Sequence, residues 1–145
     1  MPLDILLAED NPGDVRLMRE VMFDINPDVR LHVASDGIEA VAFLKREGIH
    51  AQAPRPSLIF LDLHLPKMDG RDVITRIKAD ENLRMIPIVV LTTSQGQLDI
   101  VQSYELRASC YVCKPATLKE FELLLRSINE FWLTKAKLPK PIFKS

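Results

Sequence analysis

One short apolar run that ends in an acid limits the possible folds of this chain more than any other feature. Leu58–Leu61 contains only apolar residues, and Asp62 follows directly. A run without polar alternation is typical of a strand covered on both faces, as in a parallel sheet flanked by helices. Asp62 would then lie at the carboxyl end of a strand, where open α/β sheets place their chemistry. Because a carboxylate in such a place is costly unless it is solvated, paired or metal-bound, other segments should supply partners for it.

The same pattern of strand, polar residues and helix start recurs along the chain. Strands are predicted at Asp4–Ala8, Asp28–Ala34, Leu58–Leu61, Ile88–Leu91 and Cys110–Cys113. A helix-capping signal follows each of them: Asn11-Pro12, Asp36 with Glu39, Asp69-Gly70, Ser94 with Gln97, and Thr117 with Glu120. Right-handed crossovers then require a parallel sheet with helices on both faces. We therefore predict an α/β fold, a doubly wound five-stranded parallel sheet of order 2-1-3-4-5 with five helices.

Three local details complete this prediction. Asp14 occupies the position of a capping-box acid in the first helix, and Gly48 is expected to end the second helix. Residues 49–57 contain Pro54 and Pro56 and are predicted to form a surface loop, variable or in contact with a partner.

Composition favours one globular domain of 145 residues with a formal net charge of −1. Nothing in the charge indicates nucleic acid or membrane as a partner, no stretch is apolar enough to span a bilayer, and a cytoplasmic location is expected. We place the domain at residues 1–132 and a C-terminal extension, without an output domain, at residues 133–145. Pro139 and Pro141 should forbid a helix in the extension, and Leu138, Ile142 and Phe143 have no core to enter. The extension is either a frayed basic tail or packs on a second subunit.

Polar groups follow four of the predicted strands, and the topology brings them to one edge of the sheet: Glu9, Asp10, Asp62, Thr92 and Lys114. Three acids in one cleft repel one another, and a single lysine cannot neutralise them. A hard divalent cation is the natural solution, and Mg²⁺ suits oxygen ligands. The predicted ligands are Glu9, Asp10 and Asp62, together with the backbone carbonyl of His64.

A carboxylate beside a metal, a hydroxyl and an ammonium is what in-line phosphoryl transfer onto an acid requires. Asp62 is the predicted nucleophile because it is the deepest acid. Lys114 and Thr92 would stabilise charge on the transferring oxygens.

These residues resemble a response-regulator receiver domain of the single-domain chemotaxis type, over roughly residues 3–132. The motifs are Glu9-Asp10, Asp62 with Pro66 and Met68-Asp69-Gly70, Thr92, and Lys114-Pro115. The resemblance implies a flavodoxin-like fold and a histidine kinase that donates its phosphoryl group to Asp62 with Mg²⁺. Such a protein is no enzyme in the ordinary sense, since it catalyses only its own phosphorylation and dephosphorylation.

The resemblance also implies a switch and a strained loop. Thr92 would move toward the phosphoryl group, and Tyr111 would turn inward, which changes the face formed by the fourth helix, fifth strand and fifth helix. The Lys114-Pro115 bond would be cis. One departure is that Arg107-Ala108-Ser109 precede the fifth strand where the family commonly has Gly, so this loop should bend differently.

The long loop before the third strand, the Phe131-Trp132-Leu133 helix end and the tail resemble small response regulators paired with cyanobacterial phytochrome kinases. That implies a phytochrome-type kinase as donor, and a homodimer through the changed face with help from the C-terminal extension. The alternative donor is a non-phytochrome hybrid or sensor kinase.

Three other classes of function are weighed against this one. A haloacid-dehalogenase-type phosphatase needs an acid two residues after its nucleophile, but His64 stands there. An interaction protein with a relic pocket would not need the complete polar set. A redox C-x-x-C formed by Cys110 and Cys113 is disfavoured because residues three apart on a strand point to opposite faces.

Overall fold

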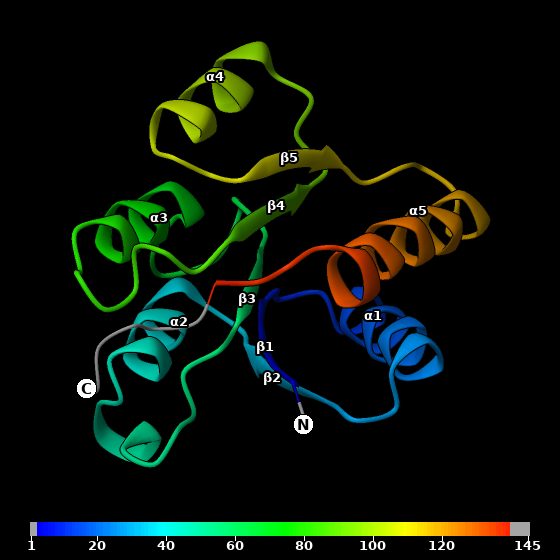
Figure 1. Cartoon of the computed structure of the whole chain (residues 1–145). Helices are drawn as coiled ribbons and strands as arrows, with labels where there is room; N and C mark the ends of the chain where they lie inside the picture. The colour runs from blue at the N-terminus through cyan, green and yellow to red at the C-terminus, as the bar shows by residue number, and fades with distance from the viewer. Residues whose placement is uncertain (1–2, 140–145) are drawn as a thin grey trace.

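The computed structural model describes residues 3–139. Its strands are β1 (Leu3–Ala8), β2 (Val29–Ala34), β3 (Leu58–Leu61), β4 (Ile88–Thr92) and β5 (Cys110–Cys113). Its α-helices are α1 (Pro12–Ile25), α2 (Gly37–Leu44), α3 (Gly70–Lys78), α4 (Gln97–Glu105) and α5 (Leu118–Glu130). The strands are parallel in the order β2-β1-β3-β4-β5, so the predicted doubly wound, flavodoxin-like α/β fold is confirmed (Figure 1). Within the described range, no helix has the length and apolar character needed to cross a bilayer.

The sheet separates two apolar cores, one on each face. Helices α1 and α5 cover one face, while α2, α3 and α4 lie on the other (Figure 1). Strand β3 contributes side chains to both cores. Ile59 and Leu61 pack with α2 and α3, whereas Leu58 and Phe60 pack with α1 and α5. All four side chains of β3 are fully buried, as an uninterrupted apolar run in a central parallel strand predicts.

The register brings the strand ends to one level. Ala8 pairs with both Ala34 and Leu61, and Thr92 pairs with Cys113. The backbone ladder continues one residue further, because Asp62 N–H donates to the Ala8 carbonyl and Lys114 N–H to the Thr92 carbonyl. The rigid sheet therefore delivers the polar residues after β1, β3, β4 and β5 to one edge.

Side-chain caps begin four of the five α-helices in the described chain. Asn11, Asp36, Asp69 and Thr117 each accept a hydrogen bond from a backbone N–H in the first turn of the helix that follows. The prediction for α4 is wrong: its N-cap is Gly96, which has no side chain, and Ser94 Oγ instead donates to Asp99 Oδ2 at 2.5 Å. The predicted role of Asp14 is also not realised, since Asn11 alone caps α1 and the Asp14 carboxylate faces another element.

The end of α2 differs from the prediction. The helix stops at Leu44, before Gly48, and Arg46 takes a left-handed backbone conformation with φ 57°. Gly48 instead begins a single 3₁₀ turn, η1 (Gly48–His50), at the start of the predicted surface loop. A left-handed backbone at an arginine has no sequence signature, whereas glycine is the usual residue at the end of a helix. The prediction that Gly48 ends α2 is therefore wrong.

The C-terminal extension is more ordered than predicted as far as residue 139. A π-helical turn, η2 (Phe131–Lys135), continues α5, so the prediction of no helix in residues 133–145 is wrong for the first three of them. Leu133 and Leu138 are partly buried against the core on the α1 and α5 face, so Leu138 does find a core to enter. The predictions for Pro141, Ile142 and Phe143 lie outside the described residues.

Candidate functional site

Three acids meet where β1 and β3 end. Ligand oxygens of Glu9, Asp10 and Asp62 all lie within 4.8 Å of one another. Glu9 and Asp62 are buried, whereas Asp10 is exposed at the mouth of the site. The strand topology predicts from the sequence that these three acids lie together, and the structure confirms that they do.

Lys114, which follows β5, is the cation of this cluster. Its Nζ lies 2.5 Å from Glu9 Oε1, 2.8 Å from Asp14 Oδ2 and 3.3 Å from Asp62 Oδ2, and its side chain is only 5% exposed. Since an ammonium has three donors, all three are engaged by carboxylates. Asp14 was missed as a site residue because its position in the first turn of α1 has an ordinary explanation as a capping acid.

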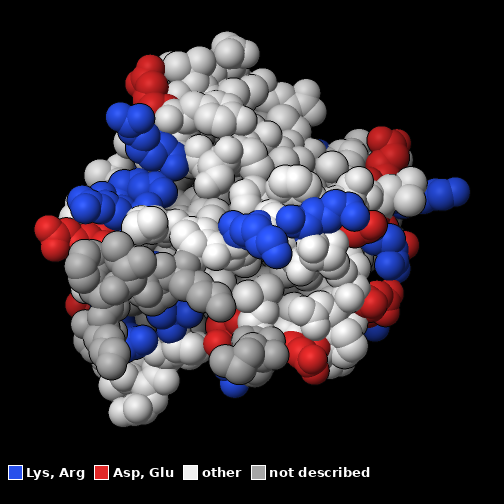
Figure 2. All heavy atoms as spheres, viewed as in Figure 1, with Lys and Arg blue, Asp and Glu red and all other residues white. Residues whose placement is uncertain are grey.

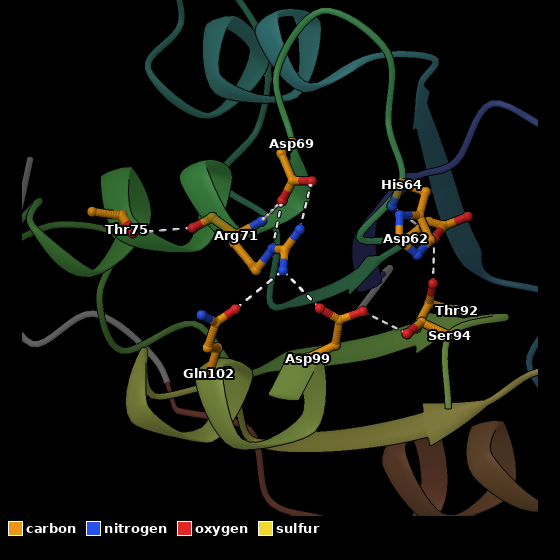
Figure 3. A network of polar contacts seen from close by, with 9 residues as sticks. All are labelled: Asp62, His64, Asp69, Arg71, Thr75, Thr92, Ser94, Asp99 and Gln102. Carbon is orange, nitrogen blue, oxygen red and sulfur yellow. Dashed lines mark hydrogen bonds and ion pairs between the residues drawn. The ribbon is translucent and has the colours of Figure 1, made fainter. Parts of the chain in front are cut away.

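Two further groups bond to Asp62 (Figure 3). The Thr92 hydroxyl, fully buried at the end of β4, donates to Asp62 Oδ1 at 2.8 Å, and the backbone N–H of His64 donates to the same oxygen at 3.1 Å. Asp62 is thus held on one oxygen by a hydroxyl and an amide and on the other by Lys114. The predicted partners Thr92 and Lys114 are both in place.

The surroundings of Glu9 and Asp62 shift the pKa values of these two acids in opposite directions. Burial raises the pKa of Glu9 to about 7, and the nearby Asp62 charge adds to this effect, although Lys114 opposes it. Burial would also raise the pKa of Asp62, but the Lys114 charge and the hydrogen bonds from Thr92 and His64 outweigh it and lower that pKa. Burial disfavours the charged form of Lys114, yet bonds to Asp14 and Glu9 and the neighbouring charges raise its pKa overall. Asp62 is therefore an anion at neutral pH.

The cluster fits a hard divalent cation. Three carboxylates that offer oxygens within 4.8 Å of one another match the ligand chemistry of such ions, and one lysine leaves the local charge negative. Glu9, Asp10 and Asp62 are the side chains that could hold it. A bound cation would neutralise these acids and polarise oxygens brought against Asp62.

A second network lies beside the site and was not predicted (Figure 3). Arg71, at the start of α3, bonds Asp69, Asp99 and Gln102, at 2.7 Å in the case of Asp99 Oδ1. Asp99 in turn accepts from the Ser94 hydroxyl, two residues beyond Thr92. The network therefore connects the α3 and α4 starts with the loop after β4.

The carbonyl of Ser94 binds the β5 side chains on the same face. Tyr111 Oη donates to it at 2.9 Å and Cys113 Sγ at 3.4 Å. Tyr111 is partly buried against the core under α2 and α3. The residue predicted to switch is thus joined, through Ser94, to the loop that carries Thr92.

Two backbone predictions around β5 have different outcomes. The expected cis bond is not found, since the Lys114–Pro115 peptide is trans. The expected difference in bend before β5 stays a prediction; the structure shows that Arg107 in this loop has φ 77°, a conformation that glycine adopts without strain.

The two cysteines do not form a site. Both are free thiols, and they belong to opposite faces of β5: Cys110 packs on the α1 and α5 core, whereas Cys113 bonds Ser94 on the other side. Burial raises the pKa of Cys110, which makes it a poorer nucleophile. The arrangement argues against the redox alternative, as the strand periodicity predicted.

A doubly wound sheet that presents a buried, anionic aspartate to a hydroxyl and an ammonium defines the receiver class of signalling domains. A family model confirms the class, since residues 5–126 match the response regulator receiver domain. The chain belongs to this family and is a two-component response regulator.

Known relatives share nearly the whole length of the chain. It is 45% identical over 138 residues to response regulator Rcp1 of Synechocystis sp., covering 95% of this chain and 94% of the relative. It is 36% identical to a probable methanogenesis regulatory protein, FilR2, of Methanothrix harundinacea, over 97% of this chain and 90% of that one.

Solved structures agree with the fold. The Mn²⁺-bound form of Rcp1 superposes with a TM-score of 0.93 at 45% identity, covering 96% of this chain and all of that one. The phosphorylated cyanobacterial phytochrome response regulator RcpA gives 0.93 at 44% identity, covering 97% of this chain and all of that one.

Proposed function

We propose that Asp62 accepts a phosphoryl group, with Mg²⁺ held by Glu9, Asp10 and Asp62 and by the backbone carbonyl of His64. The observation that carries the proposal is the set of contacts on Asp62. Thr92 and the His64 amide hold one oxygen, Lys114 approaches the other, and two further acids lie close by. A buried carboxylate kept ionised by such partners is suited to nucleophilic attack.

In the proposed step, an Asp62 oxygen attacks the phosphorus of a phosphohistidine. The phosphorus–nitrogen bond breaks, its electron pair returns to the imidazole, and an aspartyl phosphate forms. Lys114 and Thr92 then donate to the phosphoryl oxygens as negative charge develops on them. The protein catalyses this reaction only on itself, and likewise the hydrolysis in which water takes up the phosphoryl group as inorganic phosphate and the Asp62 carboxylate is restored.

The proposed donor is a histidine kinase of the phytochrome type. Support comes from RcpA, described as a cyanobacterial phytochrome response regulator, and from the 29% identical RPA3017, described in red light signalling of R. palustris. The alternative, a non-phytochrome hybrid or sensor kinase, would use the same chemistry on Asp62.

We infer that the output surface is the face formed by α4, β5 and α5. Large apolar side chains are exposed on its two helices: Leu98, Val101 and Tyr104 on α4, and Leu118 and Leu123 on α5. In the view of Figure 2 the region over α4 carries few charged side chains. A homodimer through this face of the receiver domain (residues 1–132), with help from the C-terminal extension (residues 133–145), would bury these side chains. Thr92 and Tyr111 would transmit the change through Ser94.

No nucleic acid or membrane partner is proposed, and a cytoplasmic location fits this chemistry. Both acidic and basic side chains are present on the face in Figure 2, in line with the net charge of −1.

The test is the intact mass of the protein after incubation with phosphoramidate, with Mg²⁺ or with chelator. We expect a gain of one phosphoryl group with Mg²⁺, little gain with chelator, and none in Asp62→Asn. Asp28→Asn is the matched control, since Asp28 is exposed, remote from the site, and should be labelled like the wild type. Labelling of Asp62→Asn at the wild-type level would show that another residue is the acceptor.

A further inference from the structure

Asp14 shares the ammonium of Lys114 with the phosphoacceptor. Asp14 Oδ2 lies 2.8 Å from Lys114 Nζ, closer than Asp62 Oδ2 at 3.3 Å. The carboxylate is not engaged in capping α1, because Asn11 accepts from the N–H groups of Gly13 and Asp14. Asp14 also lies outside the group of three acids that could hold a cation. Its contact in the site is therefore with the lysine.

The ammonium has no spare donor for a phosphoryl group. Its three N–H groups already face the oxygens of Glu9, Asp14 and Asp62. A phosphoryl group on Asp62 places anionic oxygens beside Nζ, and to reach them while it keeps its bond to Asp62, Lys114 must exchange one of its other two partners.

Of the two other partners, Asp14 is the one that can be released at low cost. The Glu9 side chain is 4% exposed, so its carboxylate would lose a bond without gaining water. The Asp14 side chain is 25% exposed and can be hydrated when Lys114 leaves it. Asp14 also adds a negative charge beside the ammonium that the anionic phosphoryl group must approach.

We propose that Asp14 is a positioning residue that competes with the incoming phosphoryl group for Lys114 and thereby limits the rate of Asp62 phosphorylation. This inference rests on the proposed function of Asp62. With phosphoramidate, an Asp62 oxygen bonds to phosphorus, the phosphorus–nitrogen bond breaks, and ammonia leaves with the electron pair. Lys114 gives up its contact with Asp14 and donates to a phosphoryl oxygen during this step.

The test compares labelling rates with phosphoramidate at saturating Mg²⁺, followed by intact mass. Asp14→Asn keeps the size of the side chain but removes its charge, so labelling should be about three to ten times faster, as expected for weakening one charged hydrogen bond. Asp14→Glu restores the charge and should return the rate to within about twofold of wild type. Asp24→Asn is the matched control, since Asp24 lies on the same helix and forms an exposed ion pair with Arg126, and its rate should not change.

A second readout separates positioning from a general effect on α1. In a spectrum of protein with ¹⁵N-labelled lysine and no donor, the Lys114 ammonium signal should move in Asp14→Asn and stay in place in Asp24→Asn. If the wild type is labelled but Asp14→Asn is labelled at an equal or lower rate, the inference about Asp14 is overturned and the phosphoacceptor role stands. If the wild type is labelled neither by phosphoramidate nor by a kinase, the phosphoacceptor role itself fails.

Discussion

Lowering the pH through 7 should weaken the binding of a divalent cation to this protein. The Glu9 carboxyl is buried, and its pKa is raised from 4.5 to about 7. At pH 6 it therefore carries a proton in about 90% of the molecules, and at pH 8 in about 10%. A cation can use this carboxylate only after the proton leaves, so the apparent affinity should fall about tenfold for each pH unit below 7 and level off above it.

Calorimetric titration with Mg²⁺ measures this coupling directly. Titrations in two buffers of different ionisation enthalpy give the number of protons released, which we expect to be about 0.9 at pH 6 and about 0.1 at pH 8. Glu9→Gln should bind more weakly at pH 8 but lose this pH dependence, because the titrating group is gone. Asp10→Asn, which removes a neighbouring acid of the same cluster, should bind more weakly and keep it.

The sign of the effect can also be checked on stability. A raised carboxyl pKa means that the folded chain holds the proton more tightly than the unfolded chain between pH 4.5 and about 7. Without metal, the Glu9 contribution to stability therefore decreases as the pH rises through this window. Equal Mg²⁺ affinity at pH 6 and pH 8, or a pH dependence that persists in Glu9→Gln, would refute the assignment to Glu9.

Three further substitutions test other parts of the structure. Arg107→Gly should stabilise the fold by about 0.5–1 kcal/mol in thermal unfolding, because it relieves the left-handed backbone at φ 77° while adding some freedom to the unfolded chain. Gly37→Ala should cost about 2–3 kcal/mol in urea unfolding, because a Cβ there overlaps the backbone carbonyl of Met68 in the loop that follows β3. Arg71→Ala should speed amide hydrogen exchange across α4 severalfold, because it removes the ionic bond to Asp99 from a helix without a side-chain cap.

Each substitution has a matched control in the same kind of position. Arg84→Gly changes an exposed arginine outside the left-handed region and should not stabilise. Gly13→Ala, the control for Gly37→Ala, adds a Cβ whose near neighbour is the side-chain oxygen of Asn11 at 3.3 Å, and it should be tolerated. Arg76→Ala, the control for Arg71→Ala, removes an exposed arginine from α3 and should leave hydrogen exchange in α4 unchanged. Equal effects of a substitution and its control would contradict the contact invoked for it.

The strand-end residues could be predicted from the sequence because the sheet itself places them. Buried apolar runs locate β1, β3 and β4, and parallel topology then brings Glu9, Asp62 and Thr92 to one edge whatever the details of the loops. Arg107 and Arg46 could not be predicted, since a left-handed backbone at arginine is a result of tertiary packing and not of local preference. The π-helical turn after α5 could not be predicted for a similar reason, because it depends on the packing of Leu133 and Leu138 against the core on the α1 and α5 face.

The two failed predictions for helix starts have a common cause that bears on function. Asp14 and Ser94 both carry local signals for a helix start, and both side chains are used by the site or its neighbouring network instead. For α1 the change costs little, because Asn11 caps that helix.

For α4 there is no replacement, so its start is held by the contacts of Asp99 with Ser94 and Arg71. Because these contacts are ionic or polar and only partly buried, they can be exchanged at a modest cost in free energy. Ser94 is two residues from the Thr92 hydroxyl that bonds Asp62, so a shift of Thr92 would act on the one α-helix among residues 3–139 that has no side-chain cap. An output helix beside a phosphoacceptor, as we propose for α4 and Asp62, would need this property, and the Arg71→Ala exchange measurement tests it.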